Sequence, residues 1–258
     1  PGGFGKTRLA LELASRTWME YRDGAYFVPL EKVSSGVYLV SEISKSIQFQ
    51  LDDHISELSP LEQLLDYLVD RSMLLILDGY EHLLAEVDLL EQLLYQCPEI
   101  KLLITSRQKI NLQQEYIYIL PGLDLPENES NERVELTDSL RLFIERAEQI
   151  DHCFEMTASE YPPAVQICQL MEGMPLGIEL AATWTPLLPC QEIANEIKKS
   201  LDFLETSMPD MPKKHRSLRA VFERSWTQMS VNQKNALSRL SVFQGGFNRQ
   251  AAEQIAKV

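Results

Sequence analysis

The chain has 258 residues, of which 45% are hydrophobic and 24% are charged, so it is long enough for two or three compact globular units. No apolar run approaches the roughly 20 residues of a membrane span. No signal peptide is visible, although a targeting segment upstream of residue 1 is left open. The sequence predicts no membrane partner. The cysteines show no C-x-x-C pair, which argues against a zinc or disulfide framework and favours reduced thiols in a cytoplasmic protein.

The net charge of −14 is unevenly distributed along the chain. Residues 213–258 carry nine Lys and Arg against Glu223 and Glu253, a net of +7, which leaves −21 for residues 1–212. A basic end on an acidic body indicates either contact with nucleic acid or attraction between two parts of one molecule. The second interpretation needs no further partner, and we favour it.

The first seven residues, PGGFGKT, match the phosphate-binding loop pattern G-x-x-x-x-G-K-[ST] except for its first glycine. In that pattern glycines let backbone N–H groups surround phosphate oxygens, the lysine reaches the β- and γ-phosphates, and the hydroxyl holds Mg²⁺. Helical apolar spacing follows over residues 8–14, which predicts a helix whose N-terminus favours anions. The alternative is a glycine-rich turn that only caps a helix. The residues expected to bind nucleotide here are Gly2, Gly3, Phe4, Gly5, Lys6, Thr7 and Arg8.

Strands and helices alternate after this loop. A strand normally precedes such a loop, so we expect the chain to be an excerpt of a longer protein. Apolar runs bounded by turn residues predict strands, and 3.6-residue spacing predicts helices. The expected strands are 24–30, 73–78, 100–107 and 116–120, and the expected helices are 36–50, 60–71 and 81–96. Strands that are apolar on both faces indicate a parallel sheet covered by helices on both sides. Ser59 and Pro60 have the order of an N-cap and a first helical residue.

The polar stretch 126–132 is the expected linker, and beyond it every periodic segment is helical. These segments are 137–150, 162–172, 175–187, 190–205, 214–228, 231–241 and 248–257. The sequence therefore predicts an α/β nucleotide-binding domain over residues 1–130, a small helical domain over 131–212, and a third unit over 213–258.

Asp78 ends the apolar strand 73–78, which is the arrangement that delivers a carboxylate to Mg²⁺ beside a phosphate-binding loop. Its alternative is a turn acid, because Asp-Gly is also a turn signal. Glu81, the next carboxylate, polarises the attacking water in one interpretation. In the other it stabilises the first turn of the following helix. The residues leave both open.

Thr105, Ser106 and Arg107 end the strand 100–107 at the carboxyl edge of the sheet, where open α/β folds bind ligands. The Arg107 guanidinium of this polar tip is suited to reading a γ-phosphate, although a surface arginine after a strand is common. His54 and His82 have no metal-ligand spacing and are expected to be surface or satisfied core residues.

Five motifs, in order along nearly the whole chain, resemble the signal-transduction ATPases with numerous domains, also called STAND or NB-ARC-like ATPases, in their bacterial regulator branch. They are GGFGKTRLA at 2–10, LLILDGYEHLL at 74–84, LLITSR at 102–107, GMPL at 173–176 with ELAA at 179–182, and HRSLR at 215–219 through LSVFQGGF at 240–247.

The resemblance implies a P-loop nucleotide-binding domain, a small helical domain, and a winged-helix domain whose start lies at 213–258 and which closes over the nucleotide. It implies that Lys6 and Thr7 hold phosphates and Mg²⁺, that Asp78 is the Walker B acid and that Arg107 is the sensor of the γ-phosphate. Pro175 would pack near the adenine, although Gly173 and Pro175 also fit a helix break and a first helical proline. Effector and sensor domains are expected outside residues 1–258.

The leading hypothesis is an ATP/ADP switch in a bacterial signalling or transcriptional regulator, in which slow Mg-ATP hydrolysis restores a closed ADP state and activation brings self-association. One alternative is a constitutive P-loop motor or loader acting on nucleic acid or protein. Another is a DNA-binding module formed by residues 213–258.

Overall fold

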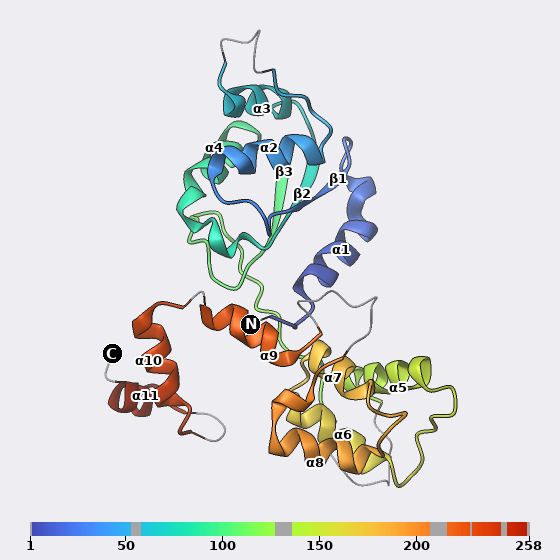
Figure 1. Ribbon diagram of the computed structural model, residues 1–258. Coiled ribbons are helices and arrows are strands. Elements are labelled where there is room, and N and C mark those ends of the chain that lie inside the picture. The colour runs from blue at the N-terminus through green and yellow to red at the C-terminus, as the bar shows by residue number, and fades with distance from the viewer. Residues whose placement is uncertain are drawn as a thin grey trace. The chain divides into compact units, whose positions relative to one another are not determined.

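The computed structural model describes residues 2–52, 58–126, 136–206, 216–227, 229–243 and 247–256 (Figure 1). The chain divides into two compact units, which are treated separately below. The α/β unit is Gly5–Leu120, and the helical unit joins Pro1–Phe4 to Pro121–Val258. The three-domain division expected from the sequence stays a prediction. Both of its boundaries, and the expected linker beyond Pro126, lie outside the described residues.

The α/β unit is built on a three-stranded parallel sheet in the order β1-β2-β3. Its strands are β1 (Ala25–Pro29), β2 (Met73–Asp78) and β3 (Ile100–Thr105), which confirms three of the predicted strands with slightly different ends. The register places Asp78 opposite Pro29 on one side and Thr105 on the other. All three strands therefore end at one level, and the residues that follow them share one edge.

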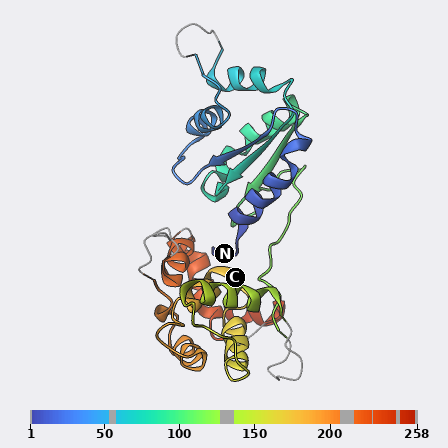
Figure 2. The same ribbon diagram turned by 90° about the vertical axis from the view of Figure 1, so that its right-hand side faces the viewer.

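Alternation along β2 explains why helices cover both faces of the sheet. Met73, Leu75 and Leu77 face a core that also contains buried residues of three helices: α2 (Gly36–Ser46), α3 (Pro60–Leu68) and α4 (Val87–Gln96). Leu74 and Ile76 face the opposite way and pack on two alanines of α1 (Lys6–Thr17). Figures 1 and 2 show α1 on one side of the sheet and α2 on the other. The predicted parallel sheet with helices on both faces is confirmed for the described residues.

Helix α3 begins as its sequence predicts. Ser59 is the N-cap, its hydroxyl accepts a hydrogen bond from the Glu62 N–H at 3.3 Å, and the Glu62 carboxylate accepts one from the Ser59 N–H at 2.7 Å. This reciprocal capping satisfies two N–H groups that the first turn would leave without partners. The helix expected over 81–96 starts as two short 3₁₀ turns, η2 (Tyr80–His82) and η3 (Leu84–Glu86), before α4. A further 3₁₀ turn, η1 (Trp18–Glu20), follows α1.

The strand predicted over 116–120 is wrong. These residues pair with no described strand, and four successive side chains are exposed, with Tyr116 fully so. The run has the aromatic and β-branched composition of a strand, but composition supplies only half of the requirement. A strand also needs a neighbour for its backbone N–H and C=O groups, and the described sheet presents none to this segment.

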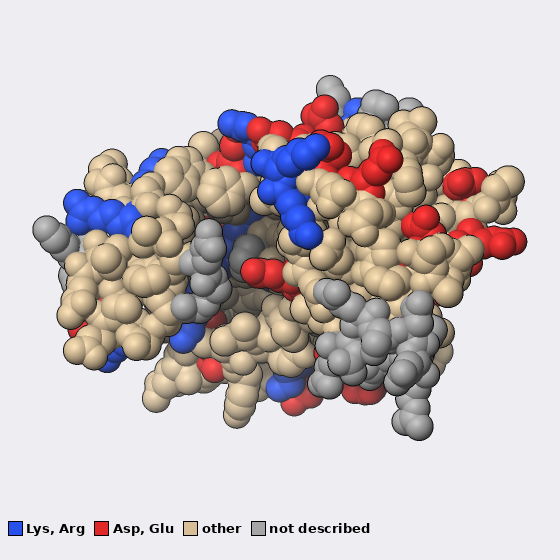
Figure 3. Space-filling view, turned by 90° about the horizontal axis from the view of Figure 1, so that it is seen from below, with Lys and Arg blue, Asp and Glu red and all other residues tan. Residues whose placement is uncertain are grey.

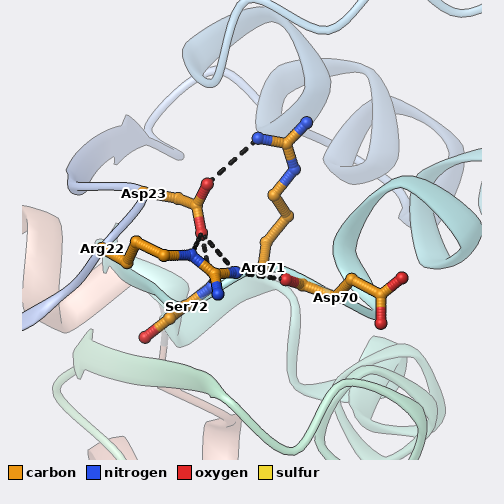
Figure 4. Close-up of polar contacts among 5 residues, drawn as sticks. All are labelled: Arg22, Asp23, Asp70, Arg71 and Ser72. Carbon is orange, nitrogen blue, oxygen red and sulfur yellow. Dashed lines mark hydrogen bonds and ion pairs between the residues drawn. The ribbon is translucent and has the colours of Figure 1, made fainter.

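The amino ends of β1 and β2 are tied together by the polar cluster in Figure 4. The Asp23 carboxylate accepts hydrogen bonds from Arg71 Nη1 at 3.0 Å, Arg22 Nε at 3.1 Å and the Ser72 N–H at 2.9 Å. Arg22 also donates to the backbone oxygen of Asp70. The Ser72 N–H and then the two arginines hold the pKa of Asp23 below its usual value, although burial opposes them. We call these five residues the amino-edge cluster.

The helical unit confirms the helices expected after residue 136, with shorter ends. They are α5 (Asp138–Ile150), α6 (Tyr161–Leu170), α7 (Pro175–Ala182), α8 (Cys190–Lys199), η4 (Leu201–Phe203), α9 (Leu218–Thr227), α10 (Val231–Leu240) and α11 (Arg249–Ala256). The apolar faces of α5 to α9 form one core, in which α5 packs on α7, α6 packs on α8, and α9 packs on α7 and η4. Helices α10 and α11 pack on each other. In the described part of this unit the only β-type contact is a single bridge between Glu205 and Ser217.

The structure agrees with two expectations from the sequence, which concern the cysteines and membrane-spanning segments. Cys97, Cys168 and Cys190 are buried, Cys153 is exposed, and all four are free thiols. Across the described residues, every helix is too short or too polar to cross a membrane.

Candidate functional site

The candidate site begins at the N-terminus of α1. Gly5 is the N-cap, with a φ of 83° that lies in the left-handed region and favours glycine. Lys6 and Thr7 are the first two helical residues, and the first turn contains no acidic side chain. The first N–H groups of a helix have no partner within it, and the capping glycine brings no side chain to them. This helix end therefore offers the backbone donors and dipole that favour an anion.

Asp78 joins this helix end to the sheet. Its Oδ1 accepts a hydrogen bond from Thr7 Oγ1 at 2.7 Å and another from Thr105 Oγ1 at 2.7 Å. The donors come from the start of α1 and from the end of β3, and the acceptor lies at the end of β2. The structure thus brings together the hydroxyl and the carboxylate that the sequence assigned to Mg²⁺.

Thr105 is a site residue that the sequence analysis did not identify. It is buried, and its Oγ1 and its backbone oxygen accept from the Gly79 N–H at 3.0 and 3.1 Å. Since a carboxylate can only accept, the Thr105 hydroxyl donates to Asp78 and is fixed in direction by Gly79. Its signal in the sequence is a hydroxyl residue at the carboxyl end of the strand next to Asp78. Of the polar strand tip over residues 105–107, only Arg107 was given a role from the sequence.

Glu81 and Arg107 form an ion pair at the same edge. Arg107 Nε lies 3.2 Å from Glu81 Oε1, and the two side chains are only 16% and 8% exposed. Taking two charges out of water is costly, and their attraction offsets this cost only if the pair has good geometry. The interpretation of Glu81 as a first-turn acid has support in its position inside η2, but its carboxylate is engaged with Arg107.

Lys6 lies in the field of these groups. Burial is the main cause that lowers the pKa of Lys6, and repulsion from Arg107 adds to it, whereas Glu81 and Asp78 raise it. The site therefore combines two cationic side chains with two carboxylates within electrostatic reach of one another. A polyanion that arrives with its own divalent cation fits such a set without leaving a large excess of charge.

The residues present suit Mg²⁺ held together with phosphates. Mg²⁺ is usually bound by one or two protein oxygens plus phosphate oxygens and water. Thr7 and Asp78 would supply those two oxygens, and the described residues contain no group of three or more His, Cys, Asp or Glu that could form a metal cage on its own. The donor set fits a phosphate-bridged cation better than a protein-only metal centre.

The other predicted binding residues are divided between the two units. Gly3 belongs to the helical unit, has a φ of 82°, and accepts through its backbone oxygen from the Leu176 N–H at 3.2 Å. Gly2 and Phe4 are half-buried beside it. Pro175 is the first residue of α7, as expected for a helix break followed by proline. Arg8 is exposed on α1.

Of the two histidines considered in the sequence, only His82 belongs to the described residues. His82 places Nε2 2.6 Å from the backbone oxygen of Val33, so its ring joins the loop after β1 to η2. This contact agrees with the expected structural role. His54 lies outside the described residues.

Comparison with known proteins identifies relatives over the whole chain. Two proteins named "Putative HTH-type transcriptional regulator", from Mycobacterium bovis and Mycobacterium tuberculosis, are each 29% identical over 256 residues, which is 99% of this chain and 27% of the relative. An uncharacterized protein of Mycobacterium tuberculosis is 28% identical over 260 residues, 62% of its length. The chain thus spans about a quarter of the regulators that it resembles. No protein-family model matches it.

Proposed function

We propose that this chain is the nucleotide-operated switch of a larger regulator, which binds ATP or ADP with Mg²⁺ at the start of α1. The observation that carries the proposal is the hydrogen bond of 2.7 Å between Thr7 Oγ1 and Asp78 Oδ1. It joins the phosphate-binding loop pattern to the strand-end acid that the pattern requires, although 71 positions separate them in sequence.

Each residue has a role in this proposal. The N–H groups at the start of α1 and the Lys6 ammonium bind phosphate oxygens, and Thr7 and Asp78 orient the cation. Arg107 reads the γ-phosphate, and Glu81, whose carboxylate pairs with Arg107 in this structure, would polarise the attacking water once it is released. Mg²⁺ would supply charge neutralisation along the phosphates. Positioning and electrostatics do most of the work in phosphoryl transfer, so a slow hydrolase needs few further groups.

The finer fold assignment is part of the same proposal. A parallel sheet with helices on both faces, together with five ordered motifs, supports a P-loop ATPase of the STAND or NB-ARC-like type with three domains over 1–130, 131–212 and 213–258. Gly2 to Arg8 and Pro175 would contact the nucleotide. Relatives named as transcriptional regulators support a place in a transcriptional regulator. A cytoplasmic location, and effector and sensor domains elsewhere in the same polypeptide, are further parts of the proposal.

The switch works by slow turnover. ADP would hold a closed state, exchange for ATP would open it and promote self-association, and hydrolysis would restore the ADP state. A constitutive motor or loader would differ in rate, because ordinary kinases and ATPases turn over at about 1–100 s⁻¹.

The deciding experiment uses the full-length protein that contains this segment. Nucleotide released by denaturing the purified protein is identified by anion-exchange chromatography, and steady-state hydrolysis of Mg-ATP is measured in parallel. Bound ADP, together with a turnover rate far below about 1 s⁻¹, supports the switch, because about 1 s⁻¹ is the lower end of the ordinary range. Protein without nucleotide that also fails to bind ATP or ADP in titration would refute the nucleotide site, and fast sustained turnover would favour the motor.

DNA binding by residues 213–258 is the second candidate function, supported by the net charge of +7. Part of that charge is engaged within the helical unit, since Arg219 pairs with Asp202 at 2.7 Å and with Glu223 at 3.0 Å. Figure 3 shows acidic side chains spread over the right-hand half of the face it draws. The pair of Arg219 with Asp202 favours attraction within the molecule, because Asp202 lies outside the basic end. Lys213, Lys214 and Lys257 lie outside the described residues.

A double substitution separates these two functions. Arg216→Glu with Arg219→Glu should speed ADP exchange and leave DNA affinity unchanged if the basic end serves contacts within the molecule. Loss of salt-sensitive DNA binding with unaltered ADP exchange would favour the DNA-binding module instead, because phosphate contacts release counterions.

A further inference from the structure

In the ion pair between Glu81 and Arg107, a carboxylate occupies the guanidinium that the proposed function requires for binding phosphate. Both partners are nearly buried, with 8% and 16% of their side chains exposed, and Nε to Oε1 is 3.2 Å. They follow β2 and β3, so they stand at the same edge as Asp78 and within the field of Lys6. An arginine that only anchored the fold would not need this location.

A guanidinium binds carboxylate and phosphate with the same planar set of N–H donors. In this structure Arg107 directs Nε at Glu81, so a phosphate that bound the guanidinium in the same way would have to displace the carboxylate. Glu81 also repels a phosphate through its own charge. The two anions therefore compete for one cation.

We propose that Glu81 is a positioning residue that shifts the nucleotide preference from ATP towards ADP, because it holds Arg107 until a γ-phosphate takes its place. This inference rests on the proposed nucleotide site. ADP has no γ-phosphate, so the ion pair persists in the ADP state. ATP must replace Glu81 at Arg107, and part of its binding free energy is used for that exchange. The charge of Glu81 thus lowers the affinity for ATP more than the affinity for ADP.

A double-mutant cycle tests the competition without relying on hydrolysis. Affinities for Mg-ADP and for the Mg complex of the β,γ-imido analogue of ATP are measured by isothermal titration for wild type, Glu81→Gln, Arg107→Gln and the double variant. Glu81→Gln should tighten the analogue about tenfold, within the coupling range for residues in direct contact, and change ADP by less than about twofold. In the Arg107→Gln background the same substitution should have no effect on the analogue.

Stability without nucleotide gives a second, independent measurement. Removing Glu81 leaves a nearly buried guanidinium without this carboxylate, so Glu81→Gln should lower the melting temperature while it raises analogue affinity. A residue with only a structural role would lower both. Glu81→Asp keeps the charge with a shorter reach and should give an intermediate affinity, which secures a result if Glu81→Gln folds poorly. Glu42→Gln is the matched control, because it neutralises an acid of α2 that pairs with Lys45 at 3.5 Å.

Three results would overturn the inference. The first is that Glu81→Gln raises the affinity for ADP as much as the affinity for the analogue. The second is that the gain in analogue affinity persists in the Arg107→Gln background. The third is that Glu81→Gln leaves analogue affinity unchanged and abolishes hydrolysis, which would make Glu81 a water-polarising residue only. If wild type binds neither nucleotide, the proposed function fails and this inference fails with it. If wild type binds both nucleotides and the cycle is additive, only the inference fails.

Discussion

The two edges of the sheet carry polar clusters made from the same kinds of residue, and they differ in exposure. At the amino edge Asp23 binds Arg22 and Arg71, whose side chains are 70% and 40% exposed. At the carboxyl edge Glu81 binds Arg107, which is 16% exposed. Ion pairs with exposed partners contribute little, and their role at the amino edge is to tie two loops together. Burying an ion pair costs desolvation free energy, and buried charges of this kind are typical of functional sites.

The two edges also differ in whether their backbone N–H groups are bound by a side chain. At the amino edge the Ser72 N–H fills one oxygen of Asp23, so this cluster is closed by the chain itself. At the carboxyl edge the backbone donors at the start of α1 meet no capping side chain from Gly5. We infer that the amino edge stabilises the fold and that the carboxyl edge binds a ligand. The predictions below would break or sharpen that contrast.

Lys6→Ala should have the largest effect on ligand binding. It removes the cationic side chain nearest to the helix end, and loss of a hydrogen bond to a charged group costs up to about 3 kcal/mol, or roughly 100-fold in affinity. Isothermal titration with Mg-ATP and Mg-ADP measures the loss. Lys45→Ala on α2 is the control, and unchanged affinity in Lys6→Ala would refute the phosphate-binding assignment.

Asp78→Asn should remove most of the dependence on Mg²⁺ while binding without Mg²⁺ is kept. An amide is a weaker ligand for a hard cation than a carboxylate, and it places an N–H₂ group near two donors, Thr7 and Thr105. The quantity to measure is the ratio of ADP affinity in Mg²⁺ to that in EDTA, which should fall towards one. A wild-type ratio would mean that another acid holds the cation.

Thr105→Val should reduce the same ratio by a smaller factor, roughly three- to tenfold, because one hydrogen-bond donor to the Asp78 carboxylate is lost while the carboxylate itself remains. Valine has the shape of threonine, so the buried position stays filled, and the Gly79 N–H keeps the Thr105 backbone oxygen as acceptor. Thr105→Ser retains the hydroxyl and should behave like wild type. If serine and valine variants give the same ratio, Thr105 does not orient Asp78.

Most of the α/β unit follows from sequence patterns, and the exceptions have physical causes. The apolar strands, Asp78 at a strand end and the Ser59 cap are local features, and each was predicted correctly. The segment 116–120 was wrong because strand formation needs a partner that composition does not reveal. Thr105 and the ion pair between Glu81 and Arg107 depend on which strands are neighbours and on register. Both are properties of the folded sheet rather than of any one motif.

Asp23→Asn should have the smallest effect on ligand binding, less than about twofold in ATP affinity, because additivity holds for distant sites. It should instead lower the melting temperature by a few degrees. The Asp23 carboxylate accepts on both oxygens, from Arg71 on one and from Arg22 and Ser72 on the other, and an amide has a single oxygen to offer. Glu12→Gln, which breaks the exposed pair with Arg16, is the control for charge alone.

The difference in stability between wild type and Asp23→Asn should depend on pH, and the pKa of Asp23 gives the direction of this dependence. The Ser72 N–H, with help from Arg71 and Arg22, lowers the pKa of Asp23 in the folded state. The unfolded chain therefore binds this proton more readily, and the stabilisation is fully present above the unfolded pKa of about 3.9 and lost as the pH falls through the lower folded pKa. Melting curves of wild type and Asp23→Asn should differ most near neutral pH and converge in acid. A gap that widened in acid, or a loss of nucleotide affinity in Asp23→Asn, would contradict the division of labour between the two edges.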